Sequence, residues 1–172
     1  MIDKITISNR PFIRITGFLQ NIWTLLVCIT WGVWWGGLTF YAVVVVPIGT
    51  SHLGSVEQGF VTQQVTIVHN WLSVLFLLCL IIEASMRSSR FLFGLGIALS
   101  ILTYELFRWH SHLSSMINFQ ERTVHTGFYQ EHAIYLWLIA TEWIIGLIVS
   151  PMLFLNSRSR TYTPSQQHRK AS

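Results

Sequence analysis

The chain has 172 residues, of which 52% are hydrophobic and only 10% are charged. A soluble domain usually carries roughly 25% charged residues, so this chain has too little charge to coat a surface that faces water. Its mean hydropathy of +0.50 points the same way. This composition excludes disordered, collagen-like and ordinary soluble proteins.

The first apolar run follows three basic residues, Lys4, Arg10 and Arg14. This arrangement resembles the start of a signal peptide, but the run is longer than an apolar signal core of roughly 7–15 residues, and no small-residue cleavage site follows it. A bilayer core needs about 20 helical residues. We therefore predict a retained membrane helix over residues 22–46, ended by Pro47 and Gly49.

Three further apolar runs follow in chain order. They predict membrane helices over residues 65–86, 91–107 and 133–155, the third span being short and dependent on Trp109 at the interface. Each must be a helix because lipid offers the backbone no hydrogen-bond partner. The predicted fold is an all-α polytopic membrane protein of four transmembrane helices packed as a bundle. Residues 1–157 form this single domain, and residues 158–172 form a basic, disordered cytoplasmic tail.

The basic residues are distributed unevenly over the predicted loops. Nine of the 11 lie in the N-terminal segment, the turn at 87–90 and the C-terminal tail, whereas only Arg108 and Arg122 lie between the third and fourth spans. The positive-inside rule then predicts a protein of the cell membrane with both termini in the cytoplasm. Nucleic-acid binding is not expected, because the positive charge is split among three short segments and forms no stripe.

Small and aromatic residues mark the first span. Gly32 and Gly36 form a GxxxG pair, for which we expect close packing inside the bundle, with a homodimer or other membrane complex as the alternative. Trp34 and Trp35 fall near mid-span, away from the interface where Trp usually lies. We expect them to fill space in the bundle, with stacking on a flat ligand as the alternative.

The histidines gather at the predicted outer end of the bundle, where six of the seven lie. Helical spacing places Glu105, Arg108, Trp109 and His112 on one face if the third span continues that far. His110 and His112 cannot both point inward from one helix. The set expected to converge beside Glu105 is His69, His112, His125 and His132.

Three interpretations of these histidines stay open. The favoured one is structural, since an amphipathic imidazole suits the boundary between membrane and water. Imidazoles with a carboxylate could also bind a divalent transition metal, and a pair could ligate haem. The third interpretation is pH sensing.

Two of the intramembrane carboxylates have a basic partner nearby in sequence. Glu83 has Arg87 at i+4, and Glu105 has Arg108 at i+3, so both can form ion pairs on their own helix.

Glu142 has no basic residue within four positions, and it lies deep in the fourth span. We expect it to be protonated or hydrogen-bonded to Thr39 or Tyr41. Because ionisable groups inside a bilayer are usually functional, Glu142, with Glu105, is the candidate for a proton relay or ligand-binding role.

Parts of three spans resemble small, four-helix bacterial membrane proteins. The resemblance implies architecture only, with no activity and no catalytic residue. It rests on residues 36–40 through Val46 and Pro47, on Gln58 to Thr62, on Phe128 to His132, and on Tyr135, Leu136, Trp137, Glu142 and Trp143.

These observations favour a non-enzymatic or accessory membrane protein whose His- and Glu-rich outer end binds a small ligand or a partner. One alternative is a membrane redox subunit that holds haem or a metal. The other is a small transporter or channel formed by an oligomer.

Overall fold

The computed structural model describes residues 10–118, 120–121 and 123–158. Nearly all of them are helical. The elements are α1 (Arg10–Phe40), a π-helical turn η1 (Tyr41–Val45), α2 (Val46–Leu53), α3 (Ser55–Met86), α4 (Arg90–Ser115), the two-residue strands β1 (Ile117–Asn118) and β2 (Thr123–Val124), and α5 (Phe128–Arg158).

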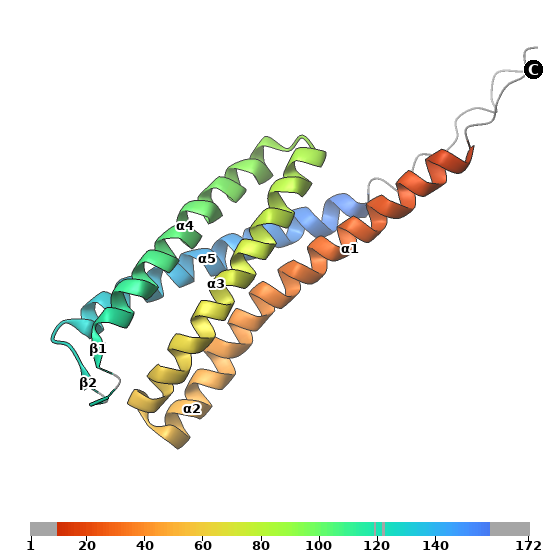
Figure 1. The fold of residues 1–172 in the computed structure, drawn as a ribbon. Helices are drawn as coiled ribbons and strands as arrows, with labels where there is room; N and C mark the ends of the chain where they lie inside the picture. Colours follow the sequence, from red (N-terminus) through yellow and green to blue (C-terminus); the bar gives the residue numbers. More distant parts are fainter. Residues whose placement is uncertain (1–9, 119, 122, 159–172) are drawn as a thin grey trace, which may run out of the picture.

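Four of these segments are long and apolar enough to cross a membrane: Phe18–Leu53, Ser55–Met86, Arg90–Ser115 and Phe128–Phe154. They pack in a ring in which α3 contacts α1 and α4, and α5 contacts α4 and α1 (Figure 1). The predicted all-α bundle of four membrane helices is confirmed. The expected disorder of the tail concerns residues 159–172, which lie outside the described residues.

The outer surface of the bundle is apolar, as a lipid-facing surface must be. Val43, Trp71, Ile101 and Trp137 are 60–74% exposed and come from four different segments of the ring. A surface of this kind would cause aggregation in water. It matches the burial pattern of a multi-pass membrane protein, whose apolar side chains face outward as well as inward.

The first membrane segment does not end at Pro47, as the sequence suggested. The helix continues through η1 into α2 and ends at Leu53. Pro47 lies in the first turn of α2, directly after the π turn. There its missing N–H and its fixed φ are tolerated, so the proline does not break the span.

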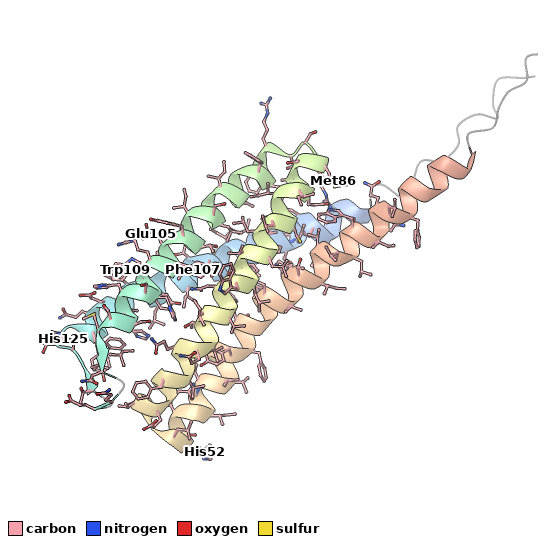
Figure 2. The ribbon with its side chains drawn as sticks, viewed as in Figure 1. His52, Met86, Glu105, Phe107, Trp109 and His125 are labelled. Carbon is pink, nitrogen blue, oxygen red and sulfur yellow. The ribbon has the colours of Figure 1, made fainter. Side chains whose placement is uncertain are left out.

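The third span is also longer than expected, because α4 runs to Ser115 and does not depend on Trp109. The connection that follows is compact. Strands β1 and β2 pair antiparallel, with Ile117 opposite Val124. This small hairpin and the α2–α3 junction form one end of the bundle, which we call the hairpin end. Figure 2 shows His52 and His125 at this end and Met86 at the other.

The close approach between helices occurs at Gly146 of α5, not at the GxxxG pair of α1. A Cβ on Gly146 would lie 2.4 Å from the Trp35 ring and 2.9 Å from the Trp34 ring, whereas nothing lies within 4 Å of a Cβ on Gly32 or Gly36. The expectation that these two glycines mediate packing inside the bundle is therefore wrong. The space over them is open because α1 turns its tryptophans inward.

The inward tryptophans fill space, as predicted. Trp34 is buried and stacks on Phe76 at 4.6 Å between ring centroids. Trp35 stacks on Trp143 of α5 and donates its indole N–H to the Trp143 carbonyl. The middle of the bundle is thus a rigid aromatic block between α1, α3 and α5.

Candidate functional site

A polar stripe runs along α3 from the hairpin end to the middle of the bundle. Its members recur every three or four residues, which places them on one helix face. That face points into the bundle, so each side chain is buried or half-buried. The stripe consists of Gln58, Thr62, Thr66, Asn70 and Ser73.

Glu142 of α5 lies at the inner end of this stripe and is fully buried. The Thr103 hydroxyl of α4 donates to Glu142 Oε1 at 3.5 Å. On the other side, Glu142 Oε2 lies 4.0 Å from Nε2 of His69. The Ser73 hydroxyl also faces the carboxyl. The site therefore joins α3, α4 and α5 around one carboxyl group.

Trp34 of α1 holds the α3 side of this site in place. Its indole N–H donates to the Ser73 hydroxyl at 2.7 Å, and the Ser73 hydroxyl in turn donates to the His69 carbonyl at 3.2 Å. The indole also lies parallel to the His69 ring, with 6.4 Å between centroids. His69 is consequently fixed in a position that directs Nε2 toward Glu142.

Several buried polar atoms in this region lack a hydrogen-bond partner. Buried polar groups in folded proteins are almost always paired with protein, water or ligand. In the described part of the chain the unpaired buried side-chain atoms are Gln63 Oε1, Tyr135 OH, Asn70 Nδ2, His69 Nε2 and Glu142 Oε2. Their gathering along one line marks this part of the bundle as a binding region.

A cavity of about 390 Å³ opens at the hairpin end above these atoms. Most of its wall is apolar, with Val46, Leu113, Phe128 and Leu136 among the lining residues. Polar residues from four helices supply the smaller part of the wall: Thr50, Ser55, Gln58, Thr62, Gln63, Thr66, His110, Ser114, Tyr129, His132 and Tyr135. A largely apolar cavity with a few convergent polar groups is typical of a small-molecule site.

The α3–α4 side of the cavity is built by a closed set of hydrogen bonds. Gln63 Nε2 donates to the Ser114 hydroxyl at 2.6 Å, and that hydroxyl donates to the His110 carbonyl. The His110 ring in turn lies 3.0 Å from the Gln63 carbonyl through Nε2. These contacts fix the wall and leave Gln63 Oε1 buried without a hydrogen-bond partner.

The histidines that were expected to converge are dispersed. His112 pairs with Glu131 on the exposed side of α4, and His132 stacks on Phe128. His125 precedes α5 and contacts the Thr126 carbonyl. Among the described residues, no group of three or more His, Cys, Asp or Glu side chains could hold a metal ion. The expected convergence of His69, His112, His125 and His132 beside Glu105 is wrong, because three of them lie on three different helices with different partners and His125 lies in the connection before α5.

The choice between the two neighbouring histidines of α4 was also wrong. His110 faces the cavity, whereas His112 is exposed. Because α4 continues as a regular helix to Ser115, two residues that differ by two positions must face different sides. The register of the helix end, which decided between them, could not be derived from the sequence.

The predictions for the three carboxylates of the spans are confirmed in part. The Glu83–Arg87 and Glu105–Arg108 ion pairs are both present. Glu142 is fully buried, but its neighbours are Thr103 and His69, not the predicted first-span residues. Thr39 instead accepts a hydrogen bond from the Trp143 indole, and the Tyr41 hydroxyl donates to Thr62.

The residues that sequence reasoning missed are Gln63, Asn70 and Tyr135. Each lies in an otherwise apolar span, and two of them belong to α3, where polar side chains recur at helical spacing. That periodicity was the available signal. Comparison with known proteins adds nothing to it, since no family model, curated protein or solved structure matches the chain.

Proposed function

We propose that this membrane protein binds one small, largely apolar molecule with a polar end, in the cavity at the hairpin end. The observation that carries the proposal is the combination of apolar walls with unpaired polar atoms, Gln63 Oε1 and Tyr135 OH, on residues of the cavity lining. An apolar body would replace lipid or water at the walls. Its polar end would satisfy atoms that are otherwise costly to bury.

The orientation of the protein is part of the same proposal. In the cell membrane, with both termini on the cytoplasmic side, the hairpin end faces the outside of the cell, and the occupant enters from that side. The basic residues at the other end, including Arg87 and Arg90, support this orientation. A reporter enzyme active only in the cytoplasm, fused after residue 172, tests it. If this fusion is inactive and the same reporter inserted after residue 120 is active, the protein has the opposite orientation.

Filling the cavity provides the test of binding. Gly59 lines the cavity, and nothing lies within 4 Å of a Cβ placed on it, so Gly59→Leu adds volume there without a clash. Gly94 of α4 is equally open but does not line the cavity, which makes Gly94→Leu the matched control.

Two measurements follow in lipid nanodiscs. Native mass spectrometry should find a small molecule retained by the wild type and by Gly94→Leu, and lost from Gly59→Leu. Thermal unfolding with 4-hexylphenol as an amphipathic probe should show stabilisation of the first two proteins only, by mass action. Equal retention and equal stabilisation in both leucine variants would refute the proposed site.

A further inference from the structure

The unpaired polar atoms form a series in space that leads from the cavity into the centre of the bundle. Gln63 and Tyr135 belong to the cavity lining, and the Tyr135 hydroxyl faces Thr66 and Asn70. Asn70 is adjacent in sequence to His69, whose Nε2 faces Glu142. Tyr135 also lies near enough to Glu142 for the two groups to interact electrostatically, so it connects the cavity lining with the carboxyl.

At the inner end of this series, two polar atoms are spaced so that one water molecule could bridge them. Glu142 Oε2 and His69 Nε2 are both buried, both lack a partner and lie 4.0 Å apart. That separation is too long for a direct hydrogen bond. It is short enough for one water molecule to contact both atoms at ordinary hydrogen-bond distances. A buried water of this kind needs two to four polar partners, and these two atoms supply the first two.

The series of unpaired polar atoms stops at the level of Ser73 and Glu142. Beyond Ser73 the inward face of α3 continues with Phe76, Cys79 and Leu80, which are at most 6% exposed. The inward positions of α5 beyond Glu142 are equally apolar, with Val149 and Leu153 buried. Toward the Arg87 turn the bundle is thus packed with apolar side chains up to the buried Glu83–Arg87 ion pair. We expect this half to be dry, so the connection opens to one end only.

We propose that these groups form a one-sided water path through which Glu142 exchanges a proton with the solution at the hairpin end. In the exchange a hydrated proton is transferred to the carboxylate, which leaves a carboxyl group and a water molecule. The groups that face Glu142 are His69 and Ser73 from α3, Thr103 from α4 and Tyr135 from α5. Helix α1 contributes Trp34, which carries no titratable proton in this range and fixes Ser73.

Thiol accessibility tests the path. In a Cys28→Ala background, Thr66→Cys and Ser73→Cys each place one thiol along the path. The native Cys79, buried two turns beyond Ser73 on the apolar side, is the matched control on the same helix. The probe is a membrane-impermeant methanethiosulfonate with a sulfonate group, added to one side of sealed vesicles at a time.

We expect both introduced thiols to react at least tenfold faster than Cys79, and only when the reagent is added at the hairpin end. Labelling from both sides would overturn the one-sided path, and labelling of Cys79 at the same rate would overturn the dry half. No labelling of either variant in folded protein would overturn the path itself. If Ser73→Cys does not fold, Thr66→Cys and the infrared measurement below carry the test.

Infrared spectroscopy tests the proton site in the unmodified chain. Difference spectra between acidic and alkaline buffer should contain a carboxyl C=O band that shifts in D₂O and is missing from Glu142→Gln. Glu105→Gln, at an exposed ion pair, is the control and should retain the band. A spectrum that is the same in wild type and Glu142→Gln would refute the proton site. Neither test depends on the cavity's occupant, so a failure of Gly59→Leu to release a small molecule would leave this inference standing.

Discussion

Gly146→Ala measures how tightly the aromatic block of α1 packs on α5. The new Cβ would lie 2.4 Å from Trp35 Cδ1, which is about 1 Å inside an ordinary carbon–carbon contact of about 3.5 Å. The same Cβ would lie 2.9 Å from the Trp34 ring. Both rings are held by indole hydrogen bonds to Trp143 and Ser73, so neither can move freely. Insertion of extra carbon into a packed core typically costs about 1–3 kcal/mol.

The control for this variant is Gly94→Ala, since a Cβ there meets nothing within 4 Å. Both substitutions gain the same helix propensity, about 1 kcal/mol relative to glycine, so their difference isolates the clash. Equilibrium unfolding in mixed micelles should make Gly146→Ala about 1–3 kcal/mol less stable than Gly94→Ala. Equal stability of the two variants would show that the Trp–Gly146 contact does not determine helix packing.

Two further predictions concern paired polar groups. Glu83→Gln leaves the Arg87 charge without its partner at a site where both side chains are less than 10% exposed, so we expect a loss of about 3–5 kcal/mol in the same unfolding assay. Glu105→Gln, at an ion pair that is about one-third to one-half exposed, should cost no more than about 1 kcal/mol; similar losses for both would contradict the assigned burial. Ser73→Ala leaves the Trp34 N–H unpaired and should cost about 1–3 kcal/mol, whereas adding Trp34→Phe to it should restore part of that loss. A strictly additive double variant would argue against this hydrogen bond.

The number and type of helices could be predicted from the sequence because the requirement of the bilayer acts on each span separately. A run of about 20 uncharged, apolar residues identifies a membrane helix without knowledge of its neighbours. The pairs Glu83–Arg87 and Glu105–Arg108 were predictable for a similar reason, since both partners lie on one helix at fixed spacing.

The partners of residues on different helices could not be predicted in this way. Whether Glu142 meets Thr39 or Thr103 depends on the order of helices around the ring and on the rotation of each helix about its axis. Gly146 illustrates the same limit. Its spacing to Ser150 at i+4 is a weaker packing motif than GxxxG, yet Gly146 allows the closest approach to α1. The GxxxG pair, which has the motif, faces open space.

The ends of the helices were the least predictable feature, and they decided the histidine assignment. His112 was placed inside on the condition that the third span continues that far, and His125 on the condition that the fourth span begins early. The first condition is met, but Arg108 and His112 on that face of α4 are exposed. In the structure α4 extends to Ser115, and α5 begins at Phe128, after the hairpin. Polar residues near a membrane surface can belong to a helix or to a connection, and composition does not distinguish the two.

The π turn at Tyr41–Val45 makes the first membrane segment tolerant of one change in length. A π turn holds one residue more than an α turn, whereas in a regular α-helix one inserted residue would rotate everything that follows by about 100°. The π turn absorbs the extra residue within one turn, so α2 keeps the orientation in which Gly49 packs on the end of the Gln58 side chain. Deletion of Val44 should therefore convert the turn to a continuous α-helix and leave this contact in place. Deletion of a residue from the regular part of α1 should instead rotate α2 relative to the rest of the helix and break the contact.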